Sequence, residues 1–151
     1  MRIVDYMRDG LIILDMDAKD KRDAILQTVE KMQESGVINS GDKFFQAVME
    51  REALGSTAIG KGLALPHART QFIDHIIIAL ARLKKGVDFD AVDAEPVELI
   101  FLLGTPLKAV GEYLTVLAKL SKILKDDNTR KKILKAKSPA EIKNIFIEAE
   151  T

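Results

Sequence analysis

Apolar residues recur at helical spacing in the first third of the chain. From Ile25 onward they lie at positions i, i+4 and i+7, which predicts an amphipathic helix over residues 18–36. Asp17 is its expected N-cap, with Asp20 three residues further on. Gly36 is placed to end the helix as the residue after the C-cap.

A second helix is expected over residues 41–53. It carries two neighbouring stripes, Phe44, Val48 and Arg51 on one and Phe45, Met49 and Glu52 on the other. Because the first stripe is otherwise apolar, we expect the Arg51 side chain to leave this helix at the edge of the core.

Three further helices are predicted towards the C-terminus. A long one covers about 108–125 and a short one about 129–136. The last has the clearest start signal in the chain, with Ser138 as N-cap, Pro139 as the first helical residue and Glu141 at the third position.

Between the helical segments lie short apolar runs that favour strands. The segments 73–83 and 97–103 are apolar on both faces, as expected for strands covered on both sides. Residues 11–14 and 63–65 are shorter runs of the same kind. Helices placed among buried strands predict a layered α/β fold, and no repeat or linker divides the 151 residues, so we expect one domain.

Composition excludes several classes of function. Lys and Arg together number 23, as do Asp and Glu, so the net charge is zero. That balance argues against a nucleic-acid binder and against a polybasic membrane patch. The longest stretch without a charged residue, 99–107, is far short of the roughly 20 residues that a membrane span needs. The chain has no cysteine and only two histidines, so disulfides and thiolate chemistry are excluded and no metal site is expected. A cytoplasmic location fits these features best.

The glycine-rich segment 55–62 is one of two features that could bear chemistry. It matches a phosphate-binding P-loop except at its last position, where Gly62 replaces the Ser or Thr that would hold magnesium. Its expected context also differs, since it follows a helix and leads into a strand. A non-covalent phosphate- or nucleotide-binding module therefore stays only an alternative, although glycines allow backbone N–H groups to face an anion.

The other feature is His67, which follows Pro66 at the expected end of the short strand. Ligands of α/β proteins bind at such strand ends. If a backbone carbonyl holds one N–H of a neutral imidazole, the other nitrogen is a fixed nucleophile. Guanidinium and hydroxyl groups that could receive a phosphoryl group lie close in the sequence: Arg51, Arg69, Ser56 and Thr57. A structural histidine and surface ion pairs of the arginines are the alternatives.

These residues also carry a family resemblance. Arg51-Glu52 and the run Gly55-Ser-Thr-Ala-Ile-Gly-Lys-Gly-Leu-Ala-Leu-Pro-His-Ala-Arg69 resemble the active-site signature of the fructose/mannitol-type enzyme IIA of the bacterial phosphoenolpyruvate-dependent sugar phosphotransferase system. Further segments follow in family order: Gly86–Ala91, Pro96-Val97, Leu99–Leu103 and Tyr113-Leu114.

The resemblance implies a mixed β-sheet flanked by helices on both faces and a phosphotransferase function. His67 matches the histidine that accepts a phosphoryl group from the histidine phosphocarrier protein and passes it to an enzyme IIB for sugar uptake, and Arg51 matches the family arginine near it. A nitrogen-regulatory branch of the family signals by its phosphorylation state instead, so a regulatory target protein is the alternative partner. No cofactor, metal, nucleic acid or direct membrane insertion is implied.

One departure from the family concerns the long helix. Many members have a second active-site histidine where this chain has Tyr113, so we expect the Tyr113 phenol to take over part of that place; a packed aromatic with its hydroxyl in solvent is the alternative. His75 matches no catalytic position and is expected to be structural. Apolar residues of the signature are candidates for the surface that meets the phosphocarrier: Ile59, Leu63 and Ala68, with burial in the core as the alternative for Leu63.

Overall fold

Two long neighbouring strands, β5 (Ile77–Val87) and β6 (Val97–Pro106), form the centre of a six-stranded mixed sheet. The computed structural model describes all residues from Met1 to Thr151. The remaining elements, in chain order, are a short 3₁₀ helix η1 (Ile3–Tyr6), β1 (Met7–Met16), α1 (Lys21–Glu34), α2 (Gly41–Ala53), β2 (Ala58–Gly60), β3 (Leu63–Ala64), β4 (His67–Thr70), α3 (Val110–Leu124), α4 (Asp127–Lys135) and α5 (Pro139–Ala149).

The sheet combines parallel and antiparallel pairs. Its strand order is β1-β5-β6-β3-β2, and β4 also pairs with β6. The pairs β1–β5, β3–β6 and β4–β6 are parallel, whereas β5–β6 and β2–β3 are antiparallel. The mixed α/β architecture with helices on both faces is therefore confirmed.

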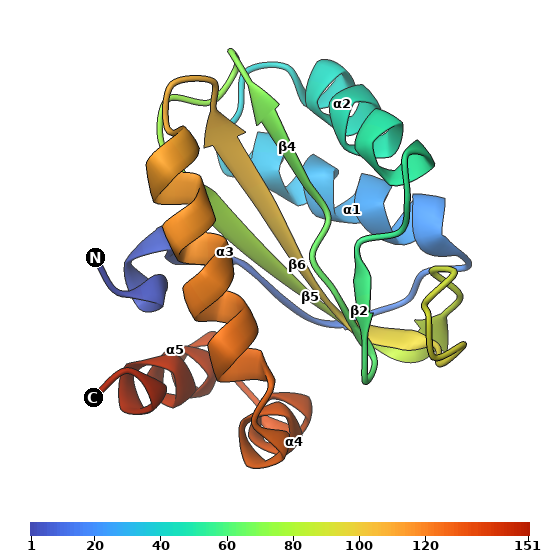
Figure 1. Ribbon diagram of the computed structural model, residues 1–151, viewed down its shortest axis with the longest axis vertical. Helices are drawn as coiled ribbons and strands as arrows, with labels where there is room; N and C mark the ends of the chain where they lie inside the picture. Colours follow the sequence, from blue (N-terminus) through green and yellow to red (C-terminus); the bar gives the residue numbers. More distant parts are fainter.

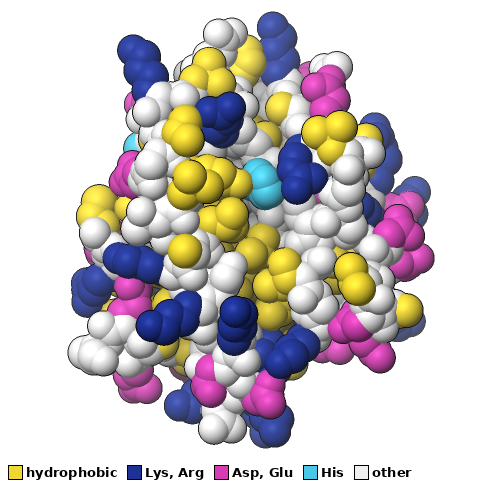
Figure 2. Space-filling model, viewed as in Figure 1, with side chains coloured by type: hydrophobic (Ala, Val, Ile, Leu, Met, Phe, Trp, Pro, Cys, Tyr) yellow, Lys and Arg dark blue, Asp and Glu magenta, His cyan; other side chains and the backbone are white.

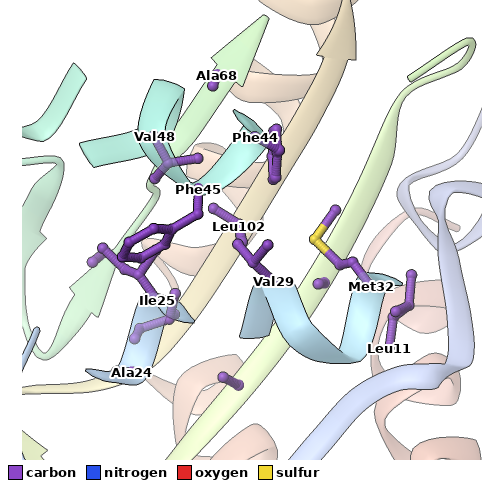
Figure 3. Packing of buried hydrophobic residues seen from close by; sticks show 14 of the residues in the cluster. Leu11, Ala24, Ile25, Val29, Met32, Phe44, Phe45, Val48, Ala68 and Leu102 are labelled. Carbon is purple, nitrogen blue, oxygen red and sulfur yellow. The ribbon is translucent and has the colours of Figure 1, made fainter. Parts of the chain in front are cut away.

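Helices cover both faces of the sheet (Figure 1). One buried cluster joins α1 and α2 to the sheet, and Figure 3 shows Phe44, Val29 and Leu102 facing one another within it. The other joins η1, α3, α4 and α5 to the opposite face, where the Phe101 and Phe146 rings meet edge to face at 5.9 Å. This explains why β5 and β6 are apolar on both sides.

Local signals placed most helix ends correctly. Helix α2 has the predicted bounds, and the Ser138 hydroxyl accepts a hydrogen bond from the Glu141 N–H at 3.2 Å, as expected at the start of α5. The predicted start of α1 was wrong. The helix begins at Lys21, because the Asp20 carboxylate, and not that of Asp17, accepts the Asp23 N–H at 2.8 Å.

Strand bounds differ more from the predictions. The strand expected over 73–83 begins only at Ile77 and runs on to Val87, opposite Val97. The strand expected over 11–14 is the middle of β1, whose pairing with β5 extends from Met7 to Met16. None of the helices has the length and apolar composition needed to cross a bilayer.

Candidate active site

His67 lies at a break in the line of strands beside β6. Strands β3 and β4 continue the same register along β6, with Leu63 opposite Leu99 and His67 opposite Leu103. Leu65 and Pro66 interrupt the line, and the Leu65 N–H donates to the Thr57 carbonyl at 3.1 Å instead. His67 therefore opens β4. The prediction that it ends a strand was wrong, because the chain resumes the same ladder after the proline.

The break fixes the imidazole of His67. Its Nδ1 lies 2.9 Å from the Leu65 carbonyl oxygen. Since a carbonyl only accepts hydrogen bonds, Nδ1 carries a proton, and in the neutral form of the ring Nε2 then has the lone pair. The half-buried ring lines a hollow of about 650 Å³. The geometry therefore fixes Nδ1 as a hydrogen-bond donor and leaves Nε2 without a hydrogen-bond partner in the protein.

Four parts of the chain build the hollow: α2, β4, the loop after β6 and α3. Its lining consists of Ala47, Glu50, Arg51, Leu54, His67, Ala68, Arg69, Leu107 and Tyr113. Figure 2 shows this face, where a histidine reaches the surface between hydrophobic side chains on the α3 side and a basic side chain on the other. Glu50, Leu54 and Leu107 were not expected from the sequence, because nothing local links them to His67.

Two guanidinium groups reach the hollow from different elements. Arg51 extends from the last turn of α2, and its Nη1 donates to the Gly55 carbonyl at 2.9 Å. Arg69 lies two residues after His67 on β4, so both side chains project from the same face of that strand. Neither arginine forms an ion pair with a carboxylate, so both retain donors for an anion.

Tyr113 completes the wall on the α3 side. Its ring centroid lies 5.5 Å from that of His67, with the two planes tilted by 45°. Burial raises the pKa of the Tyr113 phenol, and the positive charges of Arg51 and Arg69 partly oppose that shift. The residue before it, Glu112, accepts a hydrogen bond from the Tyr6 hydroxyl at 2.9 Å, which ties this end of α3 to the N-terminal segment.

The structure does not bring Ser56 or Thr57 to His67, contrary to the expectation that they support a phosphoryl group. The Ser56 hydroxyl donates to the Phe89 carbonyl and accepts the Ala58 N–H. The buried Thr57 hydroxyl donates to the Glu52 carboxylate. Both hydroxyls hold the loop and neither lines the hollow.

The glycine-rich segment 55–62 does not line the hollow either. Its second half is the turn of a β2–β3 hairpin, in which Gly60, Lys61 and Gly62 have φ values of 89°, 59° and 78°. The Lys61 N–H donates to the Asp93 carboxylate at 2.9 Å and, with the Glu95 N–H, lowers the pKa of that carboxyl. The strand-to-helix context of a P-loop is absent, as the sequence indicated, because the segment follows α2 and its turn joins two strands beside an acidic side chain.

His75 lies apart from the hollow. It precedes β5 on the exposed surface, with Nδ1 2.5 Å from the Asp74 carboxylate and Nε2 3.2 Å from the Arg8 guanidinium. These contacts agree with the expected structural role.

Exposed apolar side chains belong to the parts of the chain that build the hollow: Leu54 and Leu107 line it, and Val110 and Leu114 lie on α3 with Tyr113. We call Leu54, Leu107, Val110 and Leu114 the apolar collar; their exposed fractions run from 43% at Val110 to 85% at Leu54. The residues expected to form such a surface differ. Leu63 is buried, which agrees with its alternative role in the core. Ala68 is buried as well, and the exposed Ile59 belongs to β2 and does not line the hollow.

The fold and this site agree with the family comparison. The profile of the family "Phosphoenolpyruvate-dependent sugar phosphotransferase system, EIIA 2" matches residues 5–149, so the chain belongs to that family. Members of this family act as intermediates in phosphoryl transfer.

Individual relatives include both sugar-specific and regulatory proteins. The chain is 31% identical over 138 residues to the PTS system fructose-specific EIIA component of Haloferax volcanii, covering 91% of this chain and 90% of that protein. It is 32% identical over 146 residues, 97% of its own length, to the fructose-specific EIIABC component of Bacillus subtilis, of which it spans only 23%.

Among solved structures, nitrogen regulatory protein IIA-Ntr from Neisseria meningitidis superimposes with a TM-score of 0.90 at 33% identity, covering 95% of this chain and 98% of that one. The chain also shares the fold of the IIA protein in a complex of enzyme IIAMTL and phosphorylated enzyme IIBMTL from Escherichia coli. The TM-score is 0.79 at 20% identity, covering 94% of this chain and 99% of that one.

Proposed function

We propose that this protein is a phosphoryl carrier in which Nε2 of His67 accepts the phosphoryl group from the histidine phosphocarrier protein and passes it to an enzyme IIB for sugar uptake. The observation that carries the proposal is the 2.9 Å contact between Nδ1 of His67 and the Leu65 carbonyl. It makes Nε2 the nitrogen that has the lone pair in the neutral ring, on a histidine that lines a hollow together with two arginines. Such a carrier would work in the cytoplasm, where its donor is found.

The transfer step follows from this geometry. The Nε2 lone pair attacks phosphorus, an N–P bond forms on His67, and the N–P bond to the donor's histidine breaks, returning an electron pair to that nitrogen. The Nδ1 proton stays on His67 and remains bonded to the Leu65 carbonyl. Arg51 and Arg69 stabilise the negative oxygens of the moving group, and the Tyr113 hydroxyl donates to one of them.

A sugar-specific acceptor has support from two relatives. The chain covers 90% of a fructose-specific EIIA component, and it shares the fold of a IIA protein solved together with phosphorylated IIB. After transfer to IIB, the chain would return to its unphosphorylated state with His67 neutral.

Regulatory output is the second candidate function. The match to IIA-Ntr of Neisseria meningitidis, at 33% identity and a TM-score of 0.90, favours it. In that case the same phosphohistidine would control binding to a target protein. Affinity capture with unphosphorylated and phosphorylated protein separates the two: a carrier retains a IIB, and a regulator retains another protein in one phosphorylation state only.

Phosphorylation at His67 can be tested directly. Incubation with phosphoenolpyruvate, enzyme I and the phosphocarrier protein should label the wild type with an acid-labile, base-stable phosphoryl group. We expect His67→Ala to lose the label completely, because no other imidazole lines the hollow, and His75→Ala to keep it. Labelling of His67→Ala, combined with loss of label in His75→Ala, would overturn the assignment.

A further inference from the structure

A buried carboxylate lies directly beside Arg51 in the sequence and outside the hollow. The side chain of Glu52 is only 2% exposed, and its carboxylate is 2.8 Å from the ammonium group of Lys21 at the start of α1. A charged group is buried at such a site only when its partners compensate for the loss of water. The hollow around His67 makes no use of this carboxylate.

The second set of partners of Glu52 belongs to the loop after α2. Its carboxylate accepts the Thr57 hydroxyl and, at 3.3 Å, the Thr57 N–H. The preceding residue, Ser56, is bonded to the Phe89 carbonyl. We call Lys21, Glu52 and Thr57 the Glu52 network; it fixes residues 55–57 against α1 and the last turn of α2.

The fixed loop carries the one protein group that holds the Arg51 side chain. Nη1 of Arg51 donates to the Gly55 carbonyl at 2.9 Å. Successive residues of a helix point about 100° apart, so Glu52 faces α1 while Arg51 faces β4 and the hollow. The two side chains therefore do not contact each other, but both form hydrogen bonds with the segment 55–57. Arg51 donates to the Gly55 carbonyl, and Glu52 accepts from Thr57.

We propose that Glu52 is a positioning residue for phosphoryl transfer: through Lys21 and Thr57 it holds the loop so that the Gly55 carbonyl directs the Arg51 guanidinium at the phosphoryl group on His67. This inference rests on the function proposed above, because Arg51 needs a fixed position only if it stabilises a transferred group. A displacement of about 1 Å in such a group can slow a reaction by about 100-fold.

Kinetics of transfer from the phosphocarrier protein test the inference. We expect Glu52→Gln to slow transfer about 10- to 100-fold, since the amide no longer pairs with Lys21. In an Arg51→Ala background the same change should cost less than about twofold, because the group that Glu52 positions is already absent. Equal losses in both backgrounds would show a general structural role and overturn the inference.

Two controls separate positioning from charge loss and from instability. Glu34→Gln removes a carboxylate from an exposed pair with Lys31, at 3.4 Å on α1, and should leave the rate unchanged. Thr57→Val keeps the Glu52–Lys21 pair and removes only the hydroxyl, so it tests the same link if Glu52→Gln fails to fold. We expect Thr57→Val to slow transfer and Thr57→Ser to recover most of the loss.

A measurement independent of transfer distinguishes this inference from the proposed function. The ¹⁵N–¹H nuclear Overhauser effect of the Arg51 Nε–H group should show an ordered side chain in the wild type and a mobile one in Glu52→Gln and Thr57→Val. If both variants keep Arg51 ordered, the positioning role is excluded even when His67 is phosphorylated. If no donor phosphorylates the wild type, the proposed function fails while this measurement still reports on the Glu52 network.

Discussion

Within the hollow, the position of the Arg51 side chain depends on two parts of the chain. It extends from the last turn of α2, and it donates a hydrogen bond to the loop that follows. Hydrogen bonds to a charged group are worth about 1.5–3 kcal/mol. Arg51→Ala should therefore slow phosphoryl transfer by about 10- to 150-fold. Arg51→Lys should recover only part of this, since the ammonium lacks the planar pair of donors. Arg22→Ala, which removes an exposed arginine from α1, is the matched control and should transfer at the wild-type rate; a wild-type rate in Arg51→Ala would remove Arg51 from the site.

At the same scale, the Tyr113 hydroxyl should increase the rate of phosphoryl transfer by the same factor at every pH in the neutral range. Burial raises the pKa of this phenol above its ordinary value of about 10, so the proton needed for donation is retained. The acceptor is a negatively charged phosphoryl oxygen, and a hydrogen bond to a charged group is worth about 1.5–3 kcal/mol, so Tyr113→Phe should slow transfer about 10- to 150-fold. The ratio of wild-type to variant rates should be constant between about pH 6 and 9.

Tyr113→His supplies the contrast. A histidine there gains positive charge as the pH falls through about 6.5. Relative to the wild type, this variant should therefore transfer faster at low pH than at high pH. An unchanged rate and an unchanged phosphohistidine lifetime in Tyr113→Phe would show that the tyrosine only packs against His67.

Among the elements, the break between β3 and β4, which both pair with β6, sets the orientation of the His67 imidazole. Pro66 has no N–H to donate, and its carbonyl accepts the Leu103 N–H at 2.9 Å, so the register survives across the break. The Leu65 carbonyl is then bonded to His67. The Leu65 carbonyl, which precedes the proline, thus determines which imidazole nitrogen of His67 donates a hydrogen bond.

A second link between elements predicts an effect on stability. Arg82 on β5 donates through Nη1 to the carbonyls of Ile133, Leu134 and Ala136 at 3.0, 3.2 and 2.6 Å. These oxygens end α4 and have no partner within the helix. Arg82→Met should lower the free energy of unfolding by about 1.5–3 kcal/mol, measured by urea denaturation. The exposed Lys84→Met on the same strand should change it little, and equal values for the two variants would contradict the assigned role of Arg82.

For the whole molecule, the apolar collar predicts where a protein partner docks. Leu107 and Leu114 are 53% and 57% exposed beside the hollow, so replacing them should leave the fold intact. Encounters of this transient kind bury less than about 1,200 Å² in total. Central apolar contacts of an interface cost more than about 1 kcal/mol when lost. We therefore expect Leu107→Asp and Leu114→Asp each to raise the KM for the phosphocarrier protein at least about fivefold.

Val92 offers a matched control for the collar. It is an equally apolar and fully exposed residue in the loop between β5 and β6, and it does not line the hollow. Val92→Asp should leave the KM unchanged. A comparable rise in all three variants would show that added negative charge, and not the collar, weakens docking.

Signals confined to a few neighbouring residues could be interpreted from the sequence alone. The bounds of α2 and the cap at Ser138 depend on hydrogen bonds and apolar spacing within one or two helical turns. The same holds for the expectation that Arg51 leaves α2 at the edge of the core, and for the motif that drew attention to His67. Asp17 and Asp20 are the same residue type and both suit an N-cap. Only the structure shows that the Asp20 carboxylate accepts the Asp23 N–H at the start of α1.

Tertiary structure alone decided what lies around His67. Pairing with β6 is a contact between residues distant in sequence, so neither the break at Pro66 nor the place of His67 at the start of β4 was visible in a local pattern. Ser56 and Thr57 lie close to Arg51 in sequence but are bonded to Phe89 and Glu52. The sequence by itself determined the helices, the buried strands and the candidate nucleophile, because those follow from spacing and residue type. Which donors meet that nucleophile depended on how the sheet brings α2, β4 and α3 together.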